Sequence, residues 1–150
     1  MRITFGIREG GVAYRERSCA FGIVERDGLI ALVRVERGPA SYFDLPGGAL
    51  DAGESEGEAL AREFLEETGL QITPGVRLGE AGQYFRKSDG EPVFNACALW
   101  TGTLEAERPE AKIEDDHALV FMTPQQALVS VRHEAHALGV MLWLRRAGQA

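Results

Sequence analysis

A predicted helix with strand-like segments on both sides is the feature that most limits the fold of this chain. Residues 55–68 are predicted to form the helix, because Glu residues fill its first turn and Gly69 stands where helices commonly end. The Pro-Gly-Gly segment at residues 46–48 is a strong loop signal that ends the preceding strand. Strands, a helix, more strands and then helices indicate a mixed α/β fold (α+β), not a strict alternation of strand and helix.

The segments around this helix carry ordinary strand and turn signals. Residues 18–25 and 29–35 are apolar runs joined through Asp-Gly, which predicts a hairpin. A Thr-Pro pair at residues 123–124 predicts the start of a short helix, and a last helix is predicted over residues 133–145. Further strands are predicted at residues 41–45, 70–73, 77–87, 93–103 and 118–122.

Length, composition and charge limit the class of protein. The 150 residues are 45% hydrophobic and 26% charged, which predicts one domain over residues 1–150. The net charge of −7 argues against a general affinity for nucleic acids or anionic membranes. The chain has neither a signal-peptide pattern at its start nor a membrane-spanning apolar run. Two cysteines without metal-ligand spacing are expected to be buried free thiols, so we expect a cytoplasmic protein.

Three carboxylates fall on one face of the predicted helix. Glu63, Glu66 and Glu67 are spaced i, i+3 and i+4, and their like charges contribute nothing to helix stability. A cluster of carboxylate oxygens suits a hard cation such as Mg²⁺, which shares its coordination shell with substrate phosphates. Gly47 and Gly48 would let backbone carbonyls approach such an ion closely. From the Glu residues alone a solvated helix face is the simpler interpretation, and the wider pattern decides against it.

Residues 48–70, GALDAGESEGEALAREFLEETGL, resemble the Nudix box, G-x5-E-x7-R-E-U-x-E-E-x-G-U, in which U is a bulky aliphatic or aromatic residue. Every defined position is filled, by Gly48, Glu54, Arg62, Glu63, Phe64, Glu66, Glu67, Gly69 and Leu70. The predicted order of strands and helices agrees with the family fold. The resemblance implies an α/β/α sandwich with a mixed sheet and a catalytic loop-helix-loop.

The resemblance also implies a metal site. Glu66 and Glu67 correspond to the metal-binding carboxylates of the box, and Glu67 is the first choice among them. Glu63 corresponds to a third ligand or to the general base, and the sequence does not separate these two roles. The backbone carbonyl of Gly47 or Gly48 is a further ligand candidate. The implied cofactor is Mg²⁺, with Mn²⁺ as a substitute.

The implied reaction is attack of a metal-activated water on phosphorus in a nucleoside diphosphate linked to another moiety. ADP-ribose, a sugar nucleotide, a dinucleoside polyphosphate and a nucleoside triphosphate all fit this description. In this reaction Arg62 would belong to the catalytic group with Glu63 and Glu67, orienting a box carboxylate through its fork of donors. Glu54 would support the loop, for instance by pairing with Arg62.

Outside the box, four residues are additional candidates for the site. Glu114 and Asp116 belong to an acidic cluster before a predicted strand, and could supply a further carboxylate or simply lie in a solvated loop. Tyr84 could stack on a base or pack in the core. Arg86 stands near the position where subgroups for dinucleoside polyphosphates and ADP-ribose carry Tyr or Pro, so neither subgroup pattern is matched.

Other interpretations remain beside the leading one. The nearest rival activity is a (d)NTP pyrophosphohydrolase that removes damaged nucleotides. A non-catalytic nucleotide-sensing domain would be expected to lose box carboxylates, and none is lost here. RNA-cap removal fits poorly with the negative charge. His133 and His136 are three residues apart, not four, so ordinary surface or partly buried histidines are favoured over a zinc site. The partner is expected to be a nucleotide-type small molecule, and a homodimer is left open.

Overall fold

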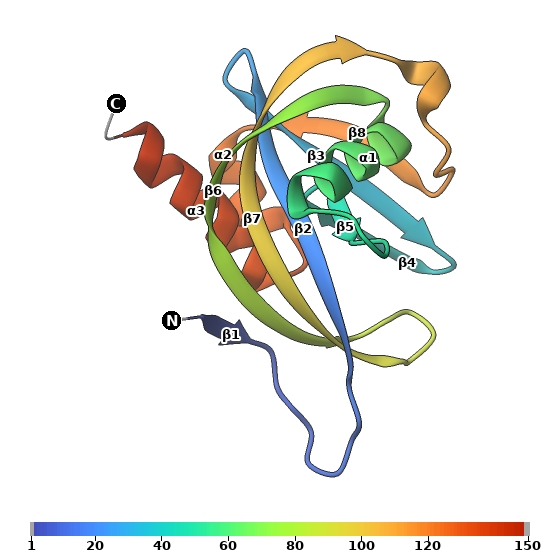
Figure 1. Ribbon diagram of the computed structural model, residues 1–150. Coiled ribbons are helices and arrows are strands. Elements are labelled where there is room, and N and C mark those ends of the chain that lie inside the picture. The colour runs from blue at the N-terminus through green and yellow to red at the C-terminus, as the bar shows by residue number, and fades with distance from the viewer. Residues whose placement is uncertain (1, 149–150) are drawn as a thin grey trace.

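The computed structural model describes residues 2–148, in which a curved mixed sheet lies between helices on its two faces (Figure 1). The elements are, in chain order, β1 (Ile3–Phe5), β2 (Arg15–Arg26), β3 (Leu29–Arg37), β4 (Ala40–Asp44), β5 (Gly47–Ala49), α1 (Glu56–Thr68), β6 (Leu70–Arg86), β7 (Pro92–Glu107), a 3₁₀ helix (Pro109–Ala111), β8 (His117–Met122), α2 (Pro124–Ser130) and α3 (Glu134–Ala147). Helix α1 covers one face, and α2 and α3 cover the other. This arrangement is the expected mixed α/β/α sandwich.

Strands β2 and β3, which are neighbours at the centre of the sheet, diverge from one another. The sheet runs β1-β6-β7-β2-β3-β4, with β5 paired to β2 and β8 paired to β3. Strands β2 and β3 pair only beside their turn, at Glu25 with Ile30 and Arg26 with Leu29. Further from the turn, β2 pairs with β5 and β7, whereas β3 pairs with β4 and β8. The two halves of the sheet therefore separate and leave room for a cavity between them.

The β2–β3 hairpin confirms the sequence prediction and has a clear local cause. Its two-residue turn consists of Asp27 and Gly28, with φ values of 54° and 80°. Two successive positive φ values define a type I′ turn, whose twist matches that of the flanking strands. Asp tolerates this conformation better than most residues, and Gly adopts it without a steric penalty.

One strand was missed by the sequence prediction, and one pair of strands was wrongly divided. Strand β4 ends at Asp44, before the Pro-Gly-Gly segment, as predicted, but Gly47 to Ala49 form a further strand, β5, and pair with Cys19 to Phe21 of β2. A Cβ atom at Gly47, where φ is 145°, would lie 2.1 Å from the carbonyl oxygen of Ala20, so only glycine fits there. The two strands expected at residues 70–73 and 77–87 form one strand, β6, whose register shifts near Pro74 without ending the pairing.

The alternation of side chains along β2 builds a core on each face of the sheet. Phe21 and Ile23 point toward α2 and α3, whereas Ala20 and Val24 point toward α1. On the α1 face they meet Phe64, which is fully buried. Burying such a ring contributes roughly 1.5–3 kcal/mol relative to leaving it exposed, and it fixes α1 against the sheet.

Cys19 and Cys97 are buried and free, as predicted. Among residues 2–148 no helix is both long and apolar enough to cross a membrane.

Candidate active site

Helix α1 is held at both ends by side-chain and backbone signals that the sequence shows directly. Ser55 and Glu58 form a reciprocal capping box at its start. Gly69, at φ 75°, ends it in the left-handed conformation, and its N–H donates to the carbonyl of Leu65. With Phe64 buried below, Glu63 and Glu67 are turned toward the cavity. The caps and the core contact thus set the direction of both carboxylates.

A cavity of about 270 Å³ lies where β2 and β3 separate. It is lined from strands β2 to β8, from α1, from the loop before β8, and from the start of α3. Four carboxylates line it, namely Asp44, Glu63, Glu67 and Glu114. Four cationic side chains line it as well, namely Arg17, Arg37, Lys87 and Arg132. A cavity with both charges can hold a cation together with an anionic ligand.

Glu67 is the deepest carboxylate of this group, with only 7% of the residue exposed. The N–H of Gly47 donates to its Oε1 at 2.9 Å, and Nε2 of His117 lies 3.2 Å from its Oε2. Burial raises the pKa of Glu67, and the contacts with His117 and Gly47 oppose that rise. A carboxylate whose charge is unfavourable in the folded protein gains from a nearby cation.

Glu63 lies beside Glu67 and faces the backbone of β5. Burial, and then the charge of Glu67, raise the pKa of Glu63 to about 7, although Arg62 opposes this. A Cβ atom at Gly48 would lie 2.8 Å from Cδ of Glu63, so glycine is required for this close approach. The structure therefore brings Glu63, Glu67 and the backbone of Gly48 together at one edge of the cavity.

Arg62 makes contacts both with the loop before α1 and with other side chains of the helix. Its Nε donates to Oε2 of Glu54 at 2.7 Å, and its Nη1 lies 3.0 Å from Glu63 and 3.2 Å from Glu66. The hydrogen bond from Arg62 lowers the pKa of Glu54 to about 2, so Glu54 stays ionised. The guanidinium also donates to the carbonyl of Ala49 at 3.1 Å. This geometry orients the helix carboxylates relative to β5.

Glu66 occupies a different place from Glu63 and Glu67. Its carboxylate pairs with Arg62 and is not among the groups that line the cavity. Its backbone carbonyl accepts the N–H groups of Ile113 and Glu114 at 2.9 and 3.1 Å. The residue therefore links the loop that carries Glu114 to α1.

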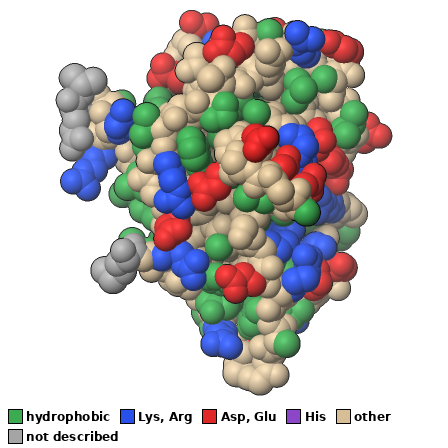
Figure 2. Space-filling model, viewed as in Figure 1, with side chains coloured by type: hydrophobic (Ala, Val, Ile, Leu, Met, Phe, Trp, Pro, Cys, Tyr) green, Lys and Arg blue, Asp and Glu red, His purple; other side chains and the backbone are tan. Residues whose placement is uncertain are grey.

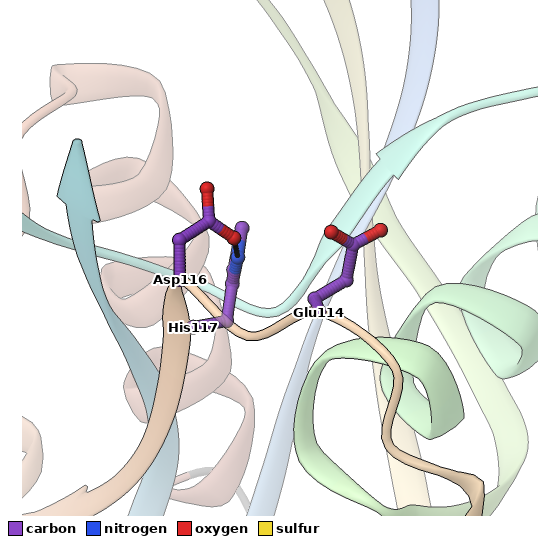
Figure 3. Close-up of side chains that lie close together, drawn as sticks. All are labelled: Glu114, Asp116 and His117. Atoms are coloured by element: carbon purple, nitrogen blue, oxygen red, sulfur yellow. Dashed lines mark hydrogen bonds and ion pairs between the residues drawn. The ribbon is translucent and has the colours of Figure 1, made fainter.

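That loop forms a second group of metal-type ligands, shown in Figure 3. One ligand atom from each of Glu114, Asp116 and His117 lies within 4.8 Å of the other two, and the three side chains project to the same side of the loop. Nδ1 of His117 lies 2.8 Å from Asp116, which also accepts from Arg37 at 2.9 Å. Burial lowers the pKa of His117, but its bonds to carboxylates outweigh this and raise it.

His117 was missed by sequence reasoning. Its only signal in the chain is that it follows the acidic cluster directly. In the structure it links that cluster to Glu67, because its two ring nitrogens face Asp116 and Glu67. Glu114 lines the cavity itself, whereas Asp116 does not and instead contacts His117 and Arg37.

Tyr84 and Arg86 do not line the cavity. The ring of Tyr84 packs against Tyr14 and Phe94, with centroid distances of 5.0 and 4.5 Å. Arg86 pairs with Glu9 at 2.7 Å. The neighbour of both, Phe85, is the aromatic side chain of this strand that lines the cavity.

His133 and His136 are buried in the cavity wall, deeper than the surface or partly buried positions that the sequence suggested. His133 stands at the N-cap position of α3 instead of lying within the helix, and its side chain makes no capping hydrogen bond. The N–H of Leu45 donates to Nδ1 of His136 at 3.1 Å. Burial lowers the pKa of both histidines to about 3, so both rings are neutral at pH 7. Among the described residues they belong to no cluster with metal-ligand geometry.

The donor atoms at the α1 edge fit a hard divalent cation. Carboxylate and backbone oxygens are the ligands that Mg²⁺ takes in proteins. Burial raises the pKa of Glu63 and of Glu67 even though Arg62 and His117 lie beside them, so the protein alone disfavours their charged forms. A bound cation would relieve both effects.

Comparison with known proteins identifies the family. The model of the Nudix domain matches residues 14–144. The chain belongs to the Nudix family. A CTP pyrophosphohydrolase of Escherichia coli is 31% identical over 111 residues, which cover 71% of this chain and 75% of that protein. An ADP-ribose pyrophosphatase of Methanocaldococcus jannaschii is 46% identical over 50 residues, which cover 33% of this chain and only 30% of that protein.

A solved structure agrees with the fold of this Nudix protein. The Nudix hydrolase from Nitrosomonas europaea superposes with a TM-score of 0.71 at 23% identity, over 89% of this chain and 90% of that one. The family and the sandwich fold predicted from residues 48–70 are thereby confirmed.

Proposed function

We propose that this Nudix protein hydrolyses a phosphoanhydride bond in a nucleoside diphosphate linked to another moiety, with Mg²⁺ as cofactor and Mn²⁺ as a substitute. The observation that carries the proposal is the meeting of Glu63, Glu67 and Gly48 at the edge of a cavity that also contains cationic side chains. Oxygen ligands for a metal and positive charges for phosphates are the two requirements of such a reaction.

The carboxylates of Glu63 and Glu67 and the carbonyl of Gly48 would hold the ion, with Glu66 and Glu114 close to them. When bound, the divalent ion neutralises charge on the phosphoryl oxygens and makes water a better nucleophile. Arg62 keeps the helix carboxylates in place. Glu63 and Glu114 both line the cavity, so each is within the space where a base must take the proton of the attacking water.

The cations of the cavity would bind the anionic part of the substrate. Arg37 lines it from β3, Lys87 from the turn after β6, and Arg132 from the segment between α2 and α3. Fixed positive groups stabilise the charge that develops on phosphoryl oxygens, and they need no rearrangement during the reaction.

The class of substrate includes ADP-ribose, sugar nucleotides, dinucleoside polyphosphates and nucleoside triphosphates. A (d)NTP pyrophosphohydrolase of the housecleaning type is the second candidate. It is favoured by the CTP pyrophosphohydrolase of Escherichia coli, because that similarity covers most of both chains. A nucleotide sensor without turnover is the third, and the intact set of box carboxylates speaks against it.

Hydrolysis of this panel of compounds tests the proposal, in Mg²⁺ and in chelator, with wild-type protein, Glu67→Gln and Glu58→Gln. Glu67→Gln keeps an acceptor for the N–H of Gly47 but loses a charged ligand. We expect it to lower kcat at least a hundredfold. Glu58→Gln is the matched control, because Gln also serves in a capping box and Glu58 lies outside the cavity. Absence of metal-dependent turnover across the panel by folded wild-type protein would overturn the proposal.

A further inference from the structure

One of the four cations in the cavity has no carboxylate partner. Three of them are neutralised locally: Arg37 by Asp116 at 2.9 Å, Lys87 by Glu91 at 3.4 Å and Arg132 by Asp44 at 2.8 Å. Among residues 2–148, Arg17 makes no ion pair. On the face shown in Figure 2, acidic and basic side chains likewise lie next to one another. An unbalanced guanidinium on a cavity wall is therefore unusual for this molecule.

Arg17 is nevertheless held in place. Its Nε donates to Oδ1 of Asn95 at 2.9 Å, and the two residues are neighbours in the parallel pairing of β2 with β7. Asn95 is buried, with 3% of the residue exposed. The next residue of this row, Gln83 on β6, accepts the N–H of Ala135 at 3.1 Å and so joins the row to α3. The contact occupies Nε of Arg17 and leaves the terminal guanidinium nitrogens for a ligand.

Two neutral aromatic side chains, His133 and Phe85, line the cavity together with Arg17. His133 faces the same cavity, and burial, then His136 and the guanidinium groups of Arg132 and Arg17, lower its pKa to about 3. Phe85 packs on His133 with a ring-centroid distance of 4.5 Å. A charged donor beside aromatic and neutral groups forms stronger hydrogen bonds than the same donor in water.

Arg17 also lies at a useful distance from the metal-type ligands. Ala20 pairs with Gly48 across β2 and β5, and Arg17 is three residues further along β2. Three residues of strand span about 10 Å, and the guanidinium of Arg17, a cation that does not ligate metals, lines the same cavity. A substrate whose phosphates lie at Glu63 and Glu67 would extend toward Arg17.

We infer that Arg17, fixed by Asn95, is a specificity-determining residue that binds an oxygen acceptor of the substrate beyond the metal-bound phosphates. This inference rests on the proposed function, because it assigns the part of the substrate that is not cleaved. The acceptor is either a carbonyl oxygen of the base or an oxygen of a further phosphate. Both present a lone pair to a cationic donor.

The kinetic test compares Arg17→Met, Arg17→Lys and Arg15→Met with the wild type on its best substrate. Arg15 is the matched control, because it lies two residues away on the same strand, is exposed, and pairs with Glu91 outside the cavity. We expect Arg17→Met to raise KM at least tenfold while kcat changes less than threefold. Arg17→Lys should restore part of the affinity, and Arg15→Met should resemble the wild type.

A binding test identifies the acceptor without requiring turnover. Calorimetric affinities in chelator are measured for IMP and AMP, for UMP and CMP, and for the corresponding triphosphates. Each pair differs by a carbonyl in place of an amino group. If the acceptor is a carbonyl oxygen of the base, Arg17→Met should weaken the binding of IMP or UMP at least tenfold. The preference of the protein for IMP over AMP, or for UMP over CMP, should then disappear. If the acceptor is a phosphate oxygen, Arg17→Met should lose the same affinity for every triphosphate and less affinity for the monophosphates.

The outcomes separate the two proposals. If Arg17→Met matches Arg15→Met in both KM and affinity while the wild type turns over substrate, the inference about Arg17 is wrong and the proposed function stands. If the wild type turns over nothing but nucleotide affinity depends on Arg17, the acceptor site stands and the hydrolytic function fails.

Discussion

The wall of the cavity formed by α1 and β5 carries carboxylates, whereas the wall formed by β2, β7 and the start of α3 carries an arginine, an amide and neutral histidines. On the first wall, Glu63 and Glu67 are within one turn of the same helix, and burial raises the pKa of both despite their contacts with Arg62 and His117. On the second, Arg17 is an unbalanced positive charge held by a neutral partner. The difference suggests a division of labour in which one wall provides the chemistry and the other selects the substrate.

Among changes that affect only one of the two walls, Gly48→Ala should have the largest effect on activity. The new Cβ would lie 2.8 Å from Cδ of Glu63, so the carboxylate must move away from β5. A displacement of about 1 Å in a catalytic group can cost on the order of a hundredfold in rate, so we expect kcat to fall tenfold to a hundredfold.

Gly10→Ala is the control for this substitution, because a Cβ there meets nothing within 4 Å and Gly10 has no positive φ. Both variants are assayed for kcat and for thermal unfolding. Equal activity of Gly48→Ala and Gly10→Ala would show that the approach of β5 to Glu63 has no catalytic role.

A smaller effect, on stability and not on activity, should come from protonation of His133 and His136 on the second wall as the pH falls. Their pKa values of about 3 lie below the ordinary value of 6.5, because burial favours the neutral rings and Arg132 lowers both values. His136 and Arg17 lower the pKa of His133 further, and Asp44 opposes this. The stabilisation is therefore complete above pH 6.5 and is lost as the pH falls from 6.5 toward 3. Between pH 7 and pH 5 each ring should remove about 2 kcal/mol from the free energy of unfolding.

Urea denaturation at pH 5, 6 and 7 measures this loss in the wild type and in a His133→Gln, His136→Gln double variant. Loss of packing in the variant would lower its free energy of unfolding equally at every pH. The decisive quantity is therefore the slope of the free energy of unfolding against pH. A slope as steep as that of the wild type would mean that other groups cause the acid sensitivity.

Sequence predicted the first wall far better than the second, for a physical reason. The Glu residues in the first turn of α1, the stop at Gly69 and the spacing of Glu63 and Glu67 are local patterns, readable within a few residues. The β2–β3 hairpin is equally local, since two residues define its turn.

The parts that sequence did not predict depend on distant pairing. Strand β5 has three residues and exists through its contacts with β2. Arg17 and Asn95 are 78 residues apart in the chain, and parallel strands bring them together. His117 was overlooked because nothing in its neighbourhood shows that its ring reaches Glu67.

Direct titration of Mn²⁺ by electron paramagnetic resonance is the measurement that tests the central claim most directly, since it detects free ion and requires no substrate. It compares the wild type with Glu67→Gln and with the control Glu58→Gln. The account predicts one tight site in the wild type and the control, and an affinity at least tenfold weaker in Glu67→Gln. Equal Mn²⁺ affinity in all three proteins would contradict the assignment of the α1 carboxylates as the metal site.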